Sequence, residues 1–384
     1  MTVEATHLPP PQRGIIRQVE IWPLRIPLRG ALQIAVGEKR PSLDVVIVRL
    51  VTEEGVYGLG ETQAWRRQGS SETLVGLIDA MQTLLIPQMI GQSVFDLAAI
   101  AARFDEVLYG RLAAKAALLD ALYDAQGHLL GVPVWQLLGG RARESIETGA
   151  VLTLRAQLED TLDEALAFYQ QGYRHFSIKA GLDIRRDIKA VSALRHALGD
   201  EARLLVDANA ALAFDDARRL LHGIAPFAVD AAEQPLALHD RHGLAALAAT
   251  SPVALILDES ITTQADLLQW IPERAAHALH TKTAKNGGIW HSRPLWQLAH
   301  AAGWQVRAGN HPATSLATLA VAHLATAWPH TLIPSPFSQS VTHDLVADVV
   351  TEPVRVDNAR LRLGTAPGWG VELDMAQIAR WQRR

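Results

Sequence analysis

Cysteine is absent from the 384 residues, which excludes disulfide bonds, thiolate metal ligands and cysteine nucleophiles. An excess of basic residues is also missing, since 36 Lys and Arg stand against 40 Asp and Glu, for a formal net charge of -4. This balance argues against nucleic acid or an anionic membrane surface as a partner, because both favour a basic face. No apolar run approaches the about 20 residues of a membrane span, since charged residues interrupt every candidate.

The same absences bear on location. The N-terminal stretch MTVEATHLPPPQRG lacks the cationic-then-apolar pattern of a signal peptide, and a chain without cysteine suits a reducing compartment. We therefore expect a cytoplasmic protein. Residues 1–13, which contain three consecutive prolines, are predicted to form a disordered leader.

The sequence pattern changes once along the chain. Residues 14–140 begin with β-rich alternation and continue with Ala and Leu at helical spacing, an order typical of an α+β domain. Gly139 and Gly140 end the helical pattern. From residue 141 to 355, strands and helices alternate. The pattern therefore predicts two domains, and residues around 33–41 and 65–73 of the first are expected to form loops.

Eight apolar strand candidates occur in the second region, each separated from the next by a helical pattern. They occupy residues 147–154, 173–181, 202–209, 227–235, 253–260, 277–285, 304–310 and 330–336. Eight parallel strands alternating with helices indicate an α/β fold of the closed (β/α)₈ barrel type, the TIM barrel. A Rossmann sheet would need a Gly-rich turn after its first strand, and ETGAVLTLRAQ has none. Residues 356–384 are predicted to return to the first domain or to the barrel rim.

Three strand candidates end in a carboxylate. The motifs are LLVDAN at Asp207, VDAAEQP at Glu233 and LILDES at Asp258, and HTKTAKNGG follows with Lys282. The intervals of 26, 25 and 24 residues match one strand, loop and helix per unit, so the charged groups are expected at neighbouring strand ends. Three converging carboxylates raise one another's pKa unless a cation joins them. All-oxygen ligands favour Mg²⁺, with Mn²⁺ as the alternative.

Lysines flank the predicted carboxylate cluster on both sides. Lys179 ends the second strand candidate and Lys282 the sixth, so two ammonium groups could act on opposite faces of one substrate carbon. Lys285 competes with Lys282 for this role. Because three residues along a strand reverse the facing, only one of the two is expected to point inward, and the regular interval favours Lys282. Lys285 is expected towards the next turn, paired or exposed.

The set SIKAG, VDAN, EQP, DES, KTAKNGG and PGWGVELD resembles the enolase superfamily, in particular its muconate-lactonizing (muconate cycloisomerase) subgroup, related to mandelate racemase. The resemblance covers nearly the whole chain. It implies an α+β capping domain on a (β/α)₈ barrel, with the loops around residues 33–41 and 65–73 setting substrate specificity. It also implies Mg²⁺ ligation by Asp207, Glu233 and Asp258, and proton handling by Lys179 and Lys282. Asn209 would then lie beside the metal ligands or the substrate, as would Glu259.

Three departures from the family pattern bear on the reaction. Ser177 stands where the family has the first lysine of its Lys-x-Lys motif. The eighth strand candidate continues as IPSPFSQ, which lacks the acid that dipeptide epimerases use to hold a substrate ammonium. His311 follows the seventh strand candidate, where it would face the pocket as a catalytic group, a substrate contact or a structural residue.

The expected function is a Mg²⁺-dependent reaction on a small carboxylate substrate, in a protein expected to form homo-oligomers. The proton α to the substrate carboxylate would be abstracted to give a metal-stabilised enediolate. Isomerisation is favoured, as cycloisomerisation, racemisation or epimerisation, because both flanking lysines are present. Dehydration of a hydroxyacid or hydroxy amino acid, and a degenerate member that binds metal or carboxylate without turnover, are the alternatives. A barrel glycoside hydrolase would leave the third acid and both lysines unexplained.

Overall fold

The computed structural model describes residues 13–34, 39–67 and 70–383. Almost all of the predicted leader, residues 1–12, lies outside this range. An antiparallel sheet of three strands comes first in the chain, in the order β1 (Ile16–Leu32), β2 (Arg40–Thr52) and β3 (Tyr57–Gln63). A short hairpin of β4 (Arg66–Arg67) and β5 (Ser70–Ser71) comes next. The helices that follow are α1 (Leu74–Asp79), the π-helix η1 (Ala80–Leu85), the 3₁₀-helix η2 (Ile86–Gln88), α2 (Leu97–Val107), α3 (Leu112–Leu130) and α4 (Val134–Leu137).

Helix α3 packs directly on strand β3, and two glycines make this approach feasible. A Cβ atom on Gly58 would lie 2.1 Å from the carbonyl oxygen of Ala121, and one on Gly60 would lie 1.9 Å from that of Ala117. Both distances are far inside van der Waals contact, so only glycine fits at these two positions. The capping domain therefore owes its close helix-on-sheet packing to the Gly-Leu-Gly of strand β3.

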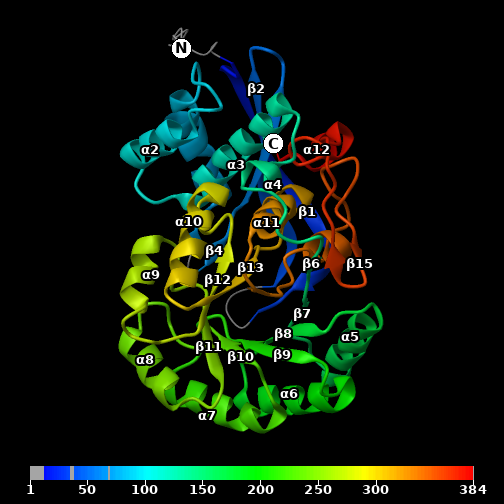
Figure 1. The fold of residues 1–384 in the computed structure, drawn as a ribbon. Helices are drawn as coiled ribbons and strands as arrows, with labels where there is room; N and C mark the ends of the chain where they lie inside the picture. Colours follow the sequence, from blue (N-terminus) through cyan, green and yellow to red (C-terminus); the bar gives the residue numbers. More distant parts are fainter. Residues whose placement is uncertain (1–12, 35–38, 68–69, 384) are drawn as a thin grey trace, which may run out of the picture.

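The predicted (β/α)₈ barrel is confirmed: eight parallel strands form one sheet in the chain order β7 to β14. The strands are β7 (Ala150–Leu152), β8 (His175–Lys179), β9 (Arg203–Asp207), β10 (Ala231–Glu233), β11 (Ala254–Leu257), β12 (Ala278–Lys282), β13 (Gln305–Gly309) and β14 (Leu332–Ile333). The intervening helices lie around the outside (Figure 1): α5 (Leu158–Gln170), α6 (Ile184–Leu198), α7 (Phe214–Ile224), α8 (Arg241–Thr250), α9 (Gln264–Trp270), α10 (Gly288–Ala301) and α11 (Ser315–Ala327). Among the described residues, no helix combines the length and apolar character needed to cross a bilayer.

The barrel closes between its first and last strands with few backbone contacts. Thr148 and Ser335 form an isolated parallel bridge just outside β7 and β14, and the amide of Gly149 donates to the Ser335 carbonyl at 2.9 Å. The side chain of Gln339 completes the seam, since it accepts from the Val151 amide at 2.6 Å and donates to its carbonyl at 3.1 Å. A side-chain amide thus substitutes for part of a strand pairing.

The barrel interior is layered, as the alternation of strand side chains requires. One inward-facing layer is apolar and takes one residue from each of four strands: Leu205, Ala231, Ile256 and Ala278. Each of these residues stands two positions before a polar residue of the next layer, so the polar groups lie directly above an apolar floor. The residues between them in sequence, such as Val206 and Leu257, belong to the larger core shared with the surrounding helices.

The C-terminal segment returns to both parts of the molecule. Strand β15 (Val356–Asp357) pairs with β16 (Arg360–Leu361), which in turn pairs with β6 (Ile146–Glu147) ahead of the first barrel strand. Helix α12 (Met375–Trp381) packs near β1 of the capping sheet (Figure 1). Between them, the Trp369 amide donates to buried Asp124 of α3 at 2.6 Å. The indole nitrogen of Trp369 donates to the Leu59 carbonyl at 2.7 Å. This segment therefore fastens the capping domain to the barrel.

Candidate active site

A cavity lies at the C-terminal ends of the barrel strands, with about 940 Å³ of atom-free space when its open mouth is included. Ile34 and Trp65 of the capping domain also line it, so both predicted specificity loops reach this cavity. All the residues selected from the sequence line it together: Ser177, Lys179, Asp207, Asn209, Glu233, Asp258, Glu259, Lys282, Lys285 and His311. Their convergence makes this cavity the candidate active site.

Strand register places the first charged groups side by side. Lys179 pairs in register with Asp207, and Asp207 with Glu233, so three adjacent strands end at one level. Asp258 follows the last residue of β11 by one position. The three acids are almost completely buried. The Lys179 ammonium donates to the Asp207 carboxylate at 2.5 Å and to the Asn209 side-chain oxygen at 3.0 Å.

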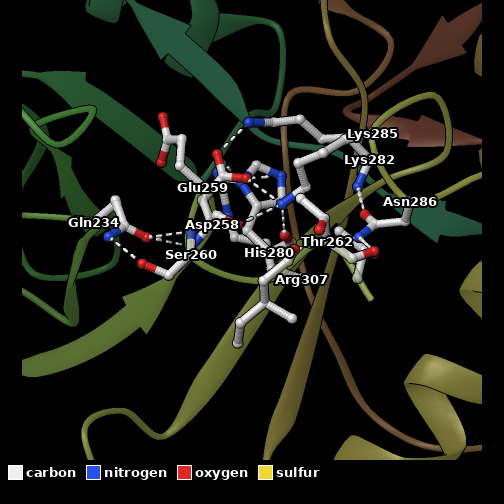
Figure 2. Close-up of polar contacts among 12 residues, drawn as sticks. Gln234, Asp258, Glu259, Ser260, Thr262, His280, Lys282, Lys285, Asn286 and Arg307 are labelled. Carbon is white, nitrogen blue, oxygen red and sulfur yellow. Dashed lines mark hydrogen bonds and ion pairs between the residues drawn. The ribbon is translucent and has the colours of Figure 1, made fainter. Parts of the chain in front are cut away.

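Asp258 receives two lysines from the neighbouring strand β12 and the turn that follows it (Figure 2). Lys282 donates to one carboxylate oxygen of Asp258 and Lys285 to the other at 2.7 Å, while Lys285 also reaches the Asp258 carbonyl oxygen at 2.5 Å. The expectation that only one of these lysines points inward is therefore wrong. Strand β12 ends at Lys282, so the alternation of a strand no longer applies to Lys285, which sits in the following turn.

Asn209 donates hydrogen bonds to two acids, Asp207 and Glu259. The Asn209 backbone, at φ 46°, lets its amide donate to Asp207 at 2.9 Å, and its side-chain nitrogen donates to Glu259 at 3.2 Å. The other Glu259 carboxylate oxygen has no hydrogen-bond partner among the described residues. Burial and the neighbouring charge of Asp258 raise the pKa of Glu259 to about 8, so this carboxyl group carries a proton at neutral pH.

The electrostatics of the three strand-end acids reflect their crowding. Burial, together with the charge of the adjacent acids, raises the pKa of Asp207, although Lys179 opposes this shift. Burial and the charge of Asp258 likewise raise the pKa of Glu233. Burial acts in the same direction on Asp258, but Lys282 and Lys285 hold its pKa well below the ordinary value. A bound cation would relieve the repulsion felt by Asp207 and Glu233.

The donor set of the cavity fits a divalent metal ion. One candidate ligand atom each from Glu233, Asp258 and His280 lie within 4.8 Å of one another. This trio shares two acids with the predicted set but has His280 in place of Asp207, whose carboxylate is held by Lys179. Two carboxylates and an imidazole suit Mn²⁺ or Zn²⁺ as well as Mg²⁺.

His280 is a site residue that the sequence reasoning missed. It stands two positions before Lys282 on strand β12, and strand alternation should have placed the two on one face. Its Nδ1 atom lies 2.8 Å from a Glu233 carboxylate oxygen. The far edge of the ring packs against Gly309, where a Cβ atom would come within 1.9 Å of the His280 Nε2 atom. Burial and the charge of Arg307 lower the pKa of His280 well below its ordinary value.

Arg307 was missed as well, although it interrupts the apolar strand β13. Its guanidinium donates to Glu233 at 2.8 Å and to the Ser177 hydroxyl at 2.5 Å, and it contacts the His280 ring at 3.0 Å. Arg307 is 2% exposed and Glu233 is 1% exposed, so this ion pair is fully shielded from solvent. Ser177 thus faces a buried cation that arrives from across the barrel.

The strand-seven and strand-eight ends complete the cavity wall. His311 is buried, and its ring stacks on the indole of Trp65 with a centroid separation of 4.7 Å and an interplanar angle of 17°. IPSPFSQ indeed contributes no acid, but Asp344, five residues after its last residue, lines the cavity. Burial, with the charge of Glu164, raises the pKa of Asp344 to about 6.

An eight-stranded barrel with buried acids and lysines at its strand ends, under an α+β cap, defines an enolase-type protein. Residues 15–139 match the mandelate racemase / muconate lactonizing enzyme N-terminal domain, and residues 160–377 match the enolase C-terminal domain-like family. The chain belongs to the mandelate racemase / muconate lactonizing enzyme family of the enolase superfamily.

Relatives with assigned activities match over nearly the full length. An N-succinyl-L-Arg/Lys racemase of Bacillus cereus is 29% identical over 94% of this chain and 95% of the relative. Muconate cycloisomerase 1 of Pseudomonas putida is 31% identical over 88% of this chain and 91% of the relative. The muconate lactonizing enzyme of Pseudomonas fluorescens, solved with muconolactone, superimposes with a TM-score of 0.92 at 29% identity, over 96% and 100% of the two chains.

Proposed function

We propose that this protein is a divalent-metal-dependent isomerase that moves the proton on the carbon α to a substrate carboxylate. One observation carries the proposal. Lys179 and Lys282 end the second and sixth of eight barrel strands, so they stand across the cavity from each other, with buried acids on the three strands between them. The substrate carbon would lie between the two ammonium groups.

A divalent metal would be held by Glu233 and Asp258, with Asp207 or His280 as the third protein ligand. When bound, it would neutralise the substrate carboxylate and so make the adjacent C–H bond more acidic. We retain Mg²⁺ as the first candidate and Mn²⁺ as the second, because oxygen atoms predominate in the donor set.

The two lysines differ in their contacts. The Asp258 carboxylate raises the pKa of Lys282 against the effect of burial, so Lys282 holds its proton and can donate it or stabilise negative charge. Lys179 contacts Asp207 and Asn209, and its position across the cavity suits proton removal from the other face. Lys285 adds a third buried ammonium close to the charge that develops on the enediolate oxygen atoms.

Racemisation or epimerisation follows if the opposite lysine returns a proton to the same carbon. Cycloisomerisation, in the ring-opening direction, follows if the enediolate instead forms a C=C bond and breaks a ring C–O bond at the β-carbon, so that the oxygen leaves as a carboxylate of the same molecule. The relatives named above include both kinds of enzyme. We further propose a small carboxylate as substrate, a homo-oligomeric assembly and a cytoplasmic location, as expected from the sequence.

Proton exchange in D₂O tests the proposal. Candidate N-acyl amino acids, hydroxyacids and muconate-like diacids would be incubated with the enzyme and Mg²⁺, and loss of the α-proton signal followed by NMR. We expect exchange with at least one class, and its loss after chelation with EDTA. Lys179→Ala and Lys282→Ala should each reduce the exchange rate by at least about 100-fold, the usual contribution of a positioned acid or base.

The matched control is Lys189→Ala, which removes an exposed lysine from helix α6 and should leave the exchange rate unchanged. Circular dichroism would verify that all variants remain folded. If Lys179→Ala and Lys282→Ala both exchange at the wild-type rate, the lysines do not handle the proton and the proposal is wrong.

A further inference from the structure

Two side chains at the end of strand β13 present polar atoms that nothing in the described chain satisfies. Asn310 has neither an acceptor for its amide nitrogen nor a donor for its amide oxygen, although both atoms are buried. The Nδ1 atom of His311 is also buried without a partner, and the His311 side chain is only 5% exposed. Buried polar groups normally find partners, because leaving one unsatisfied costs about 1–3 kcal/mol.

Both residues line the active-site cavity, so a ligand in that cavity is the partner they can reach. Two other polar residues of this wall are already engaged. Gln339 uses its oxygen and nitrogen on the backbone of Val151, as described above. Asp344 accepts a hydrogen bond from Gln339, although burial raises the pKa of Asp344. Arg307 Nε and one Glu259 carboxylate oxygen also lack a partner among the described residues, but both lie within the cluster of acids and lysines. Outside that cluster, the buried unsatisfied groups of the cavity are those of Asn310 and His311.

The His311 ring is held in place rather than free to turn away. It stacks on Trp65, and the Arg40 guanidinium lies 4.2 Å from the centre of the same indole ring. This stack joins the capping domain to the strand end, so the orientation of His311 depends on the cap being seated on the barrel. A fixed, unsatisfied ring nitrogen is the kind of polar group that sets ligand orientation in an otherwise apolar pocket.

The charge of this wall defines the class of group that it would accept. Burial and the ammonium of Lys282 hold the pKa of His311 well below its ordinary value, so the imidazole is neutral. A neutral imidazole offers one donor and one acceptor, and the Asn310 amide offers both kinds of group. A charged ligand group would find no counter-ion in this pair.

Building on the proposed function, we infer that Asn310 and His311 form a specificity subsite for an uncharged group of the substrate, a carboxamide or hydroxyl. The substrate carboxylate occupies the charged end of the cavity, and its second functional group hydrogen-bonds to this pair. A substrate with a second carboxylate or an ammonium group at this position is disfavoured, because neither charge would be compensated there.

Matched probes test the subsite. N-acetyl-L-leucine carries a neutral amide, whereas N-ethyl-L-leucine has nearly the same shape but a cationic amine. cis,cis-Muconate supplies the dianionic comparison. Binding would be measured by calorimetry and α-proton exchange by NMR. The wild-type protein should bind N-acetyl-L-leucine at least about tenfold more tightly than the other two probes, the discrimination expected from one or two hydrogen bonds.

Two variants remove the hydrogen bonds while keeping the shape. Asn310→Leu and His311→Phe should each weaken N-acetyl-L-leucine binding about tenfold and leave binding of N-ethyl-L-leucine unchanged. His311→Phe retains the stack on Trp65. The control, His222→Phe, alters an exposed histidine on helix α7 and should have no effect.

The outcomes separate this inference from the proposed function. Equal losses for the amide and the amine, no loss for either, or preferential binding of muconate would overturn the subsite. If N-acetyl-L-leucine binds in the expected variant-sensitive manner but none of the N-acyl amino acids, hydroxyacids and muconate-like diacids exchanges its α-proton, the subsite stands and the proposed proton transfer is contradicted.

Discussion

The buried ion pair between Arg307 and Glu233 yields the sharpest test of how this site is held together. Replacing Arg307 with Met keeps most of the side-chain volume but removes the charge and three contacts, to Glu233, Ser177 and His280. Both members of the pair are at most 3% exposed, so water cannot replace the lost guanidinium. Breaking such a pair typically costs about 3–5 kcal/mol, and we expect Arg307→Met to lose stability by this amount.

Ser177 offers a way to separate loss of charge from loss of packing. Its hydroxyl lies 2.5 Å from the Arg307 guanidinium, so a lysine at position 177 would extend into the space that Arg307→Met vacates. The double variant Ser177→Lys/Arg307→Met should therefore recover at least about 2 kcal/mol of the loss, a coupling expected only of groups in direct contact. Ser177→Lys alone crowds two cations together and should destabilise the protein.

Urea unfolding followed by tryptophan fluorescence measures the four free energies of this cycle, and α-proton exchange follows activity in parallel. Ser177→Met/Arg307→Met is the control, since it fills the space without restoring the charge and should recover little. If Arg307→Met costs less than about 1 kcal/mol, or if the Met control rescues as well as Lys, the account of Arg307 as the necessary counter-charge to Glu233 is incorrect.

Two further predictions concern neighbouring packing and pH. Gly309→Ala would place a Cβ atom 1.9 Å from the His280 ring, so the ring must shift. The affinity for the metal, measured by calorimetry, should then fall. An unchanged affinity would exclude His280 as a ligand. Burial raises the pKa of Asp120 to about 7 from 3.8, so the folded state binds the proton more tightly and stability falls as pH rises from about 4 to 7. The loss is a few kcal/mol at about 1.4 kcal/mol per pKa unit. Asp120→Asn should abolish this loss, making the variant more stable than wild type in urea at pH 8 but not at pH 4; equal pH profiles would contradict the shift.

The sequence predicted the site well where a single apolar strand ends in a single charged residue. Apolar runs that end in Asp207, Glu233 and Asp258 predicted both the strands and their common end, because parallel strands with similar loops finish at one level. The eighth strand was predicted too, although only Leu332 and Ile333 pair there. Its identity follows from the count of repeating units rather than from its own length.

The sequence was less informative where the contact partner comes from a distant strand. Arg307 and Ser177 are 130 residues apart, and nothing local indicates that the arginine faces the barrel interior and reaches the serine. Lys285 lies in the turn and is paired, as expected, but it also faces the cavity; this was missed because strand alternation was applied past the end of β12. Asp344 could not be assigned to the cavity, since it belongs to the π-helix η4 (Ser340–Asp344) beyond the strand-eight motif.

The returning C-terminal segment has a consequence for how the chain folds. The barrel seam needs Ser335 and Gln339, whose partners Thr148 and Val151 lie 187 and 188 residues earlier in the chain. The carboxylate of Asp124 on α3 accepts its hydrogen bond from Trp369. Contacts this distant in sequence form slowly, because the entropy cost of closing a long loop comes before the contacts can stabilise the chain. During synthesis, the barrel cannot reach its final hydrogen bonding before residue 339 has been made, and the cap cannot before residue 369. The two parts should therefore complete their packing late and together, after residue 369 has left the ribosome.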